Sequence, residues 1–487
     1  MNNEELINGI GNIDDDIIAI TAISRKKRSK KPLIIKLTAM AACVCLILSA
    51  VFFLPPPKEA GEGGSLIAPM TTLALEAEYP TMPQYPNDAL AEENWDDYNA
   101  AMDEWRSYNR EVCGYPTQAQ LHGVDKFLVN TAAAFLKTNN GENALYSPMN
   151  VYFALSMLAE TAEGETRSQI LNVLGFDSLE SLRQAVNVIW KANYRDDGSV
   201  KSLFANSVWL NNQLEYNSEV LNIFKDKYYA SSYSGTMGSP EYDEALKLWI
   251  NTQTGDLLSE SVKNLEGFNP DTVFALASTV YFKASWSDKF ISTYNTNEIF
   301  HSAKGDVECE FMNQSRSDTY YRGENFGAIS KSMRNYGRMY FILPDEGTTP
   351  EKLISDGDVL EFIVSPGENT EQSHPLINMK VPKFDVTADL SLIDGLKEIG
   401  VIDAFDPDKA DLSTITDISS YVNRVDHSAR VTIDEEGCEA AAFTLIAADA
   451  GSTLPKDEID FYLDRPFIFV ITSPINTPLF IGIVNNP

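Results

Sequence analysis

The sequence predicts an α+β fold with mostly antiparallel sheets over residues 119–487. The chain has 487 residues, of which 44% are hydrophobic and 10% aromatic, so it can build a large core. Helical spacing of apolar residues comes first, at Phe127, Leu128, Ala132, Phe135 and Leu136. Strand-like runs follow, namely TVFALASTVYF, RMYFILP, INMKVPKF, RPFIFVI and PLFIGIV. Strands and helices that do not alternate regularly are typical of this fold class.

The first 31 residues are polar and end in the basic cluster RKKRSKK, and residues 32–54 form an apolar segment. Within it, Leu37–Leu54 is an uncharged run long enough to span a bilayer, which predicts a transmembrane anchor. A cleaved signal peptide is the alternative, but its polar leader is long and no small-x-small site follows cleanly. The basic cluster predicts a cytosolic N-terminus, so the remainder would be extracellular on a single-pass cell-membrane protein, with secretion as the alternative.

The segment 55–118 is rich in Pro, Gly, Glu and Tyr. This composition predicts a partly extended stalk, with one helix around Asp96–Val112.

Charge and cysteine content exclude several functions. The formal net charge of −32 argues against nucleic acid as a partner, because like charges repel. Outside the apolar run, Cys113, Cys309 and Cys438 show no CxxC or Cys/His clustering, so we expect no metal site and no disulfide framework. A single Cys113–Cys309 bridge stays open. No HExxH, GxSxG or complete phosphate loop occurs, so the sequence predicts no catalytic residues and no cofactor.

Several dispersed motifs, in one order along the chain, resemble those of the serpins, a family of serine protease inhibitors. They are NALYSPMNVYFALSMLAETAEGETRSQILNVLGF, STVYFKASWSDKF, VPKFDVTADLSLIDGLKEIGVIDAF and the closing RPFIFVITSPINTPLFIGIVNNP. The resemblance covers residues 119–487 and is to serpins of the bacterial type. It implies three mostly antiparallel sheets, surrounding helices, an exposed reactive-centre loop and a monomer. It also implies that the chain is an inhibitor and not an enzyme.

One C-terminal stretch combines the pattern of a buried strand with that of an exposed loop. Val431–Ile446 looks like a buried strand, whereas Ala447–Lys456 is small and polar like an exposed loop. The part EEGCEAAA resembles the hinge of inhibitory serpins, and the following residues resemble their reactive-centre loop. The resemblance implies that a protease cleaves this loop, stays attached as an acyl-enzyme, and is deformed when the hinge inserts into a sheet. The expected hinge residues are Glu435, Glu436, Gly437, Cys438, Glu439, Ala440, Ala441 and Ala442.

The residues themselves are compatible with insertion, because alternate side chains of a strand share a face. One face would be small and uncharged: Cys438, Ala440, Ala442, Thr444, Ile446 and Ala448. The opposite face would carry Glu439, Ala441, Phe443 and Leu445 at the surface. No charge would therefore be buried, and Gly437 would supply backbone freedom at the pivot. Cys438 and Phe443 depart mildly from the family, where Thr or Ser and a small residue are commoner.

The reactive bond is placed by the family's spacing. Counting from Gly437 gives Gly451 followed by Ser452, and counting back from Arg465 gives the bond Ser452–Thr453, so the position is defined within two residues. The residues in this window are small, which predicts elastase-like or subtilisin-like serine proteases with small apolar specificity pockets as partners.

The resemblance also assigns structural roles around the main sheet. His427 matches the histidine that latches this sheet, together with Ser147. Asn150 stands where the family usually has Ser, and Ser278 where it usually has Asn, which looks like an exchange that keeps one amide and one hydroxyl. Trp286 matches a residue of the breach, where the loop first enters the sheet.

No basic stripe marks a polyanion site. Arg183, Lys191 and Arg195 are scattered, so we expect no polyanion activator. Two alternatives to inhibition stay open, a non-inhibitory surface binding module and a membrane-anchored cleavage sensor.

Overall fold

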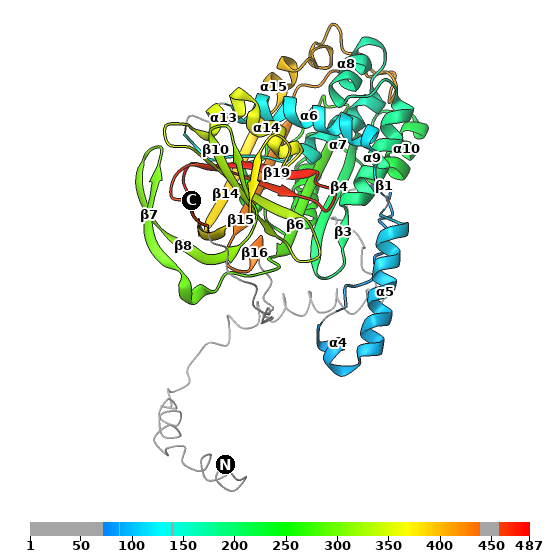
Figure 1. The fold of residues 1–487 in the computed structure, drawn as a ribbon. Coiled ribbons are helices and arrows are strands. Elements are labelled where there is room, and N and C mark those ends of the chain that lie inside the picture. Colours follow the sequence, from blue (N-terminus) through cyan, green and yellow to red (C-terminus); the bar gives the residue numbers. More distant parts are fainter. Residues whose placement is uncertain (1–71, 87, 114, 138–140, 439–456) are drawn as a thin grey trace, which may run out of the picture. The chain divides into compact units, whose positions relative to one another are not determined.

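The computed structural model describes residues 72–86, 88–113, 115–137, 141–438 and 457–487, and within them the strands form three sheets. The main sheet has the order β1-β5-β4-β6-β16-β15-β14, with β3 paired to β4 (Figure 1). These strands are β1 (Thr72–Leu75), β3 (Arg195–Asp196), β4 (Val200–Asn211), β5 (Ala230–Gly235), β6 (Phe274–Ser285), β14 (Phe384–Ser391), β15 (Asp426–Ile433) and β16 (Gly437–Cys438). All pairs in it are antiparallel except β4 with β5.

The second sheet has the order β12-β9-β10-β11-β18-β19-β2, and the small sheet has the order β17-β13-β8-β7. The second sheet contains β2 (Ala144–Tyr146), β9 (Tyr320–Gly323), β10 (Phe326–Ser332), β11 (Arg338–Pro344), β12 (Glu371–Ser373), β18 (Phe467–Thr472) and β19 (Pro478–Val484). The small sheet contains β7 (Thr296–Ser302), β8 (Gly305–Ser317), β13 (Leu376–Pro382) and β17 (Glu458–Tyr462). This architecture confirms the predicted α+β class with mostly antiparallel sheets.

Helices surround the sheets. They are α4 (Asp88–Glu93), α5 (Trp95–Glu111), α6 (Gln118–Leu136), α7 (Pro148–Thr161), α8 (Gly164–Leu174), α9 (Leu179–Asn193), α10 (Ser218–Tyr228), α11 (Pro240–Gln253), α12 (Ser259–Lys263), α13 (Pro350–Asp356), α14 (Asp358–Val364) and α15 (Ile393–Glu398). Short 3₁₀ turns lie at Ser292–Tyr294 and Asp403–Phe405. Capping residues fix several helix starts, as at α6, where Thr117 and Gln120 form a capping box.

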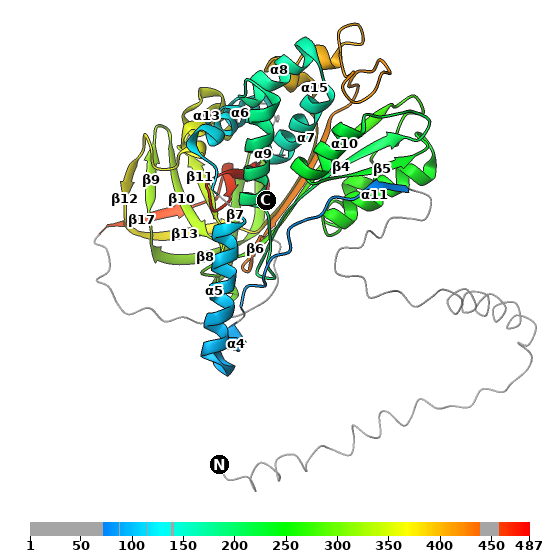
Figure 2. The same ribbon diagram turned by 90° about the vertical axis from the view of Figure 1, so that its right-hand side faces the viewer.

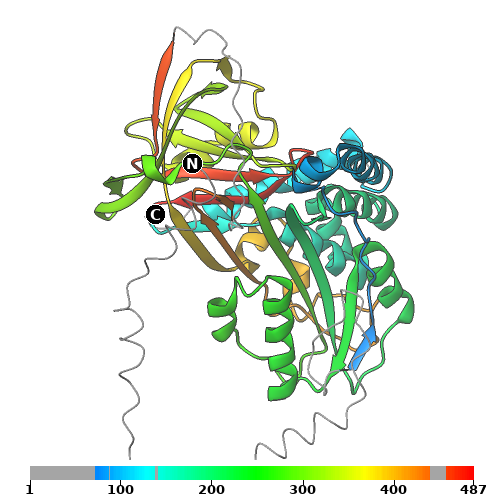
Figure 3. The ribbon, with the colours of Figure 1, turned by 90° about the horizontal axis from the view of Figure 1, so that it is seen from below.

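Two helices cover opposite faces of the main sheet. The buried helix α7 packs beneath it within the large core, alongside Phe204 and Val208 of β4. Helix α11 covers the other face, where its Tyr242 and Trp249 pack with Trp209 of β4. Figures 2 and 3 show α11, in green, lying across these strands. One face of the main sheet is thus covered by the large core, and on the other face α11 packs over Trp209 of β4.

The segment expected to be a stalk folds in part onto the domain. The predicted helix is present as α5. Upstream of it, β1 adds to the edge of β5, with Leu73 paired to Tyr233, and the Tyr79 ring stacks on Trp190 at 5.7 Å. The stalk prediction is wrong for this part because TLAL can satisfy the open edge of β5, and because Tyr79 finds an aromatic surface.

Other predictions concern residues outside the described ones. The segments 1–31 and 32–54 both lie there. Among the helices that the structure does describe, none has the length and apolar character needed to cross a membrane.

Cys113 and Cys309 are free thiols, so the bridge left open between them is not formed.

Candidate functional site

The start of the predicted hinge is already seated in the main sheet. β16 lies between β6 and β15, with Cys438 opposite both Ala284 and Ile433. The carbonyl groups just before it are also bound, because the Trp286 amide donates to Glu436 O at 2.9 Å and the Phe290 amide donates to Glu435 O at 3.2 Å. The structure thus places Glu435, Glu436, Gly437 and Cys438 at one end of a seam between two long strands.

Close approach to the backbone of β6 requires a glycine at position 437. A Cβ atom there would lie 2.2 Å from the Ala284 carbonyl oxygen and 2.7 Å from Ser285 Cα. Both are backbone atoms of β6, which cannot move aside as a flexible side chain would. The glycine therefore lets the hinge touch β6 at the point where the two strands separate.

Two ion pairs hold the carboxylates that precede the glycine. Glu435 lies 2.8 Å from Lys383 Nζ and accepts from Asn295 Nδ2 at 2.6 Å, and Glu436 lies 2.5 Å from Lys289 Nζ. Burial tends to raise the pKa of Glu435, but the bonds from Lys383 and Asn295 outweigh it and lower the pKa. No sequence pattern indicates these partners, which come from distant loops and strands.

The structure describes one side chain of the predicted inner face, that of Cys438. Cys438 is 2% exposed and belongs to the main core, as do Ala284 and Ile433 opposite it. Residues opposite one another in antiparallel strands share a face. Cys438 therefore points into the core, as predicted for the first residue of the small, uncharged face.

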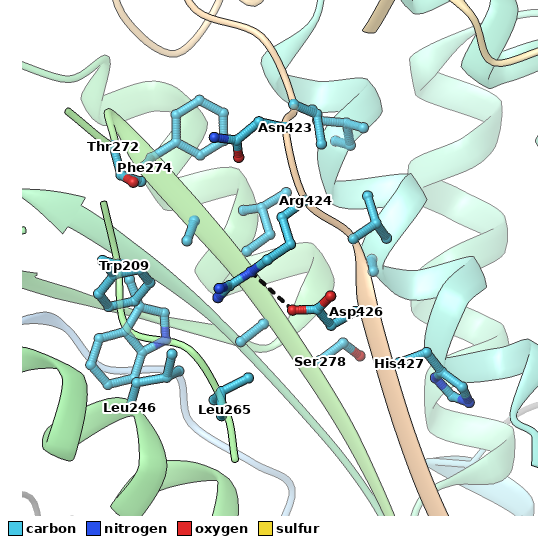
Figure 4. Close-up of a pocket in the computed structure, with 18 of the residues that line it drawn as sticks. Trp209, Leu246, Leu265, Thr272, Phe274, Ser278, Asn423, Arg424, Asp426 and His427 are labelled. Carbon is cyan, nitrogen blue, oxygen red and sulfur yellow. Dashed lines mark ion pairs between the residues drawn. The ribbon is translucent and has the colours of Figure 1, made fainter. Parts of the chain in front are cut away.

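The seam continues beyond the seat. Among the described residues, no strand pairs with the inner edges of β6 and β15 below Cys438. At the far end lies a cavity of about 870 Å³, bounded by β6, by α7 and by the segment 419–428 that leads into β15 (Figure 4). Asp426 and Arg424 form an ion pair of 2.9 Å at its wall, and Ser278 and His427 line it.

The predicted latch residues meet at this cavity. His427 Nε2 accepts the Ser147 amide at 3.1 Å, and burial lowers the pKa of this histidine to about 4, so it is neutral. Asn150 and Ser278 both line the cavity. The hydroxyls of Ser147 and Ser278 are buried and have no hydrogen-bond partner among the described residues. Buried hydroxyls of this kind usually acquire a partner.

The same geometry excludes a Ser/His/Asp catalytic triad. The His427 nitrogen faces a backbone amide rather than the Ser147 hydroxyl, and Asp426 pairs with Arg424. The hydrogen bond between Ser147 Oγ and His427 that such a triad requires is therefore not formed among the described residues.

We predict that Asn150 and Ser278 act as one exchanged pair. Asn150→Ser or Ser278→Asn alone should lower the free energy of unfolding by about 1–3 kcal/mol, because each change leaves two hydroxyls or two amides at these positions in place of one of each. The double variant should be nearly neutral. Urea unfolding of all four proteins measures the coupling, and additive single effects would refute the exchange.

Trp286, predicted at the breach, lies directly against the hinge. It is 1% exposed, and its indole Nε1 donates to the Asp434 carbonyl at 3.0 Å. The remaining predicted residues, Glu439, Ala440, Ala441 and Ala442 of the hinge and the bond at Gly451 and Ser452, lie outside the described residues.

Comparisons with known proteins give a consistent result. The family model described as "Serpin (serine protease inhibitor)" matches residues 122–487. Serpin-Z1B of Triticum aestivum is 29% identical over 71% of this chain and 90% of its own. Alpha-1-antiproteinase S of Cavia porcellus is 26% identical over 77% of this chain and 93% of its own.

Solved structures agree with these sequence relatives. The native thermophilic serpin tengpin has a TM-score of 0.69 at 27% identity, covering 77% of this chain and 96% of its own. The structure of thyroxine-binding globulin with thyroxine has a TM-score of 0.63 at 22% identity, covering 75% and 99%, and shows likeness of fold alone.

Proposed function

Because the chain belongs to the serpin family, we propose that it traps serine proteases by loop cleavage followed by insertion of the hinge into the main sheet. The seat of β16 between β6 and β15 carries this proposal. The first two residues of a new central strand are paired there, and the edges that would receive the rest face each other below them.

The register of β16 can be extended down the seam. Cys438 opposes Ala284 and Ile433, so continuation would bring Ala442 opposite Val280 and Ala429. By the same count, Thr444 would arrive opposite Ser278 and His427. Its hydroxyl would reach the latch, where the Ser278 hydroxyl lacks a described partner. On the outer face, Glu439 would come opposite Lys283, where opposite charges attract.

The energy of such an insertion is large. If about twelve residues gain two ladder hydrogen bonds each, at roughly 0.5–1 kcal/mol per bond, the release is on the order of 10–20 kcal/mol. This is comparable with the whole stability of an ordinary domain, so deforming an attached protease is energetically feasible.

The reactive bond proposed at Gly451 and Ser452 favours proteases with shallow apolar pockets. Small residues there cannot form the ion pair that trypsin-like enzymes require. The proposed targets are therefore elastase-like or subtilisin-like serine proteases.

One gel tests the proposal. The domain from residue 67 onward is mixed with pancreatic elastase and with subtilisin, and SDS-stable complexes of the summed mass are expected. A catalytic-serine-to-alanine protease is the control and should give no complex. Cleavage near Ser452 with no complex would instead support the alternative of a non-inhibitory binding module.

We further propose that residues 32–54 anchor the protein in the cell membrane with the serpin domain outside. The basic cluster before the apolar run, and the acidic residues after it, support this orientation.

External protease treatment of intact cells should therefore release the serpin domain and leave residues 1–31 protected. Antibodies to each end, applied to blots before and after treatment, measure this. An N-terminus near Ala60 in untreated cells would show that the apolar segment is removed as a signal.

A further inference from the structure

A buried lysine lies against Trp286 and Phe290, the two residues whose amides bind the hinge. Lys331 of β10 is 1% exposed, and its Nζ donates to Gln314 Oε1 at 2.5 Å. Among the described residues, no carboxylate lies within ion-pair distance of it. An ammonium in this position is costly unless other groups stabilise it.

Two aromatic rings provide that stabilisation. Lys331 Nζ lies 4.2 Å from the centre of the Phe290 ring and 5.7 Å from that of Trp286. A desolvated ammonium over such rings gains a cation–π attraction, which is lost when the amine is neutral. The amides of these same two residues bind Glu435 O and Glu436 O. Lys331 thus contacts the rings of the same two residues whose backbone amides bind the hinge.

The charged groups around Lys331 come from the turn 286–290, from β8 with the residue that follows it, and from the hinge. Gln314 links the lysine to Asp288 of the turn, donating to Asp288 Oδ2 at 2.8 Å. Arg316 of β8 lies 3.1 Å from Asp288 and 3.1 Å from Asp318, so it occupies both carboxylates. On the hinge side, Lys289 and Glu436 neutralise each other.

This environment makes the charge of Lys331 variable. Burial lowers its pKa to about 7, with Arg316 adding to the shift and Asp288 and Asp318 opposing it. Protonated and neutral forms are then both populated near neutral pH.

We propose that Lys331 is a proton-dependent support of the hinge, whose ammonium holds Trp286 and Phe290 against residues 435–436 and whose neutral amine releases them. The hold is strong below the lysine's pKa and weak above it. The idea that this release eases insertion of the loop rests on the function proposed above. The idea that the ammonium holds Trp286 and Phe290 does not rest on it.

Hydrogen exchange of the intact protein, without protease, tests the hold. After correction for intrinsic exchange rates, protection of the Trp286 and Phe290 amides should fall about tenfold between pH 6 and pH 8. Lys331→Met removes the charge at similar volume and should show the lower protection at both pH values. Lys331→Arg keeps the charge and should show the higher protection at both.

Matched controls separate this support from general effects. Lys289→Met removes the ion pair to Glu436, so it should lower protection by a similar factor at pH 6 and pH 8 and leave the ratio between the two pH values as in wild type. Amides in β18 and β19 should show no such pH dependence. Flat protection in the wild type would overturn the proposal even if neither Lys331 variant folds. An unchanged pH profile in Lys331→Met would overturn it as well. A protein that forms no protease complex but shows the expected exchange would refute only the proposed function.

Discussion

Ala442→Arg should convert the protein from an inhibitor into a substrate of its target protease. In the register set by Cys438, residue 442 would insert opposite Val280 and Ala429, on the face that points into the core. Burying an unpaired guanidinium there costs about 3 kcal/mol or more, which corresponds to at least about 100-fold slower insertion. The acyl-enzyme would then hydrolyse first. The measurement is the number of protease molecules inactivated per loop cleaved.

A neighbouring substitution provides the control. Phe443→Arg adds the same charge one residue away, but in the extended register it would lie opposite Thr279 and Ser428 on the outer face. For Phe443→Arg, the number of protease molecules inactivated per loop cleaved should stay within a few-fold of the wild-type value. Equal loss in both variants, or a stable complex with Ala442→Arg, would exclude insertion in this register.

Cleaving the loop should raise the thermal stability of the protein steeply. Completing the seam between β6 and β15 would release on the order of 10–20 kcal/mol through its new ladder hydrogen bonds. For a domain of this size, that corresponds to a rise in melting temperature of about 10–25 °C. Scanning calorimetry before and after nicking by a small catalytic amount of protease measures the change.

A glycine variant separates insertion from a general effect of cleavage. Gly437→Val places a side chain against the Ala284 carbonyl, so the hinge cannot take its seat. The melting temperature of Gly437→Val should rise far less on cleavage than that of the wild type. If cleaved wild type gains no stability at all, the main sheet does not accept the loop.

Local patterns were enough to predict much of the fold. Residues such as Phe469 and Ile481 lie in continuous apolar runs that become buried strands, and the helix at Trp95–Glu111 follows from its composition. The face of Cys438 was predictable because a strand alternates with a period of two residues. These properties depend only on near neighbours in the chain.

The partners of the hinge could not be predicted in this way. Lys383 and Lys289 reach Glu435 and Glu436 from far along the chain, and nothing in their local sequence marks them. Lys331 lies in a strand of ordinary composition, and only the packing of Phe290 over it reveals a buried charge. In the same way, β1 joins β5 across a separation that no periodicity encodes.

The strand β1 has a practical consequence for self-association. A free edge of a large sheet is a template on which a second molecule can pair, and β1 occupies that edge beside β5. The match to the family begins only at residue 122, so a boundary drawn from family likeness would remove this cover and leave the aromatic face at Trp190 without Tyr79. A protein shortened in that way would expose both an unpaired strand edge and an aromatic surface, and would be prone to aggregate. Residues 72–79 thus cover the edge of β5 and the ring of Trp190, and we expect a protein that keeps them to aggregate less than one that begins at residue 122.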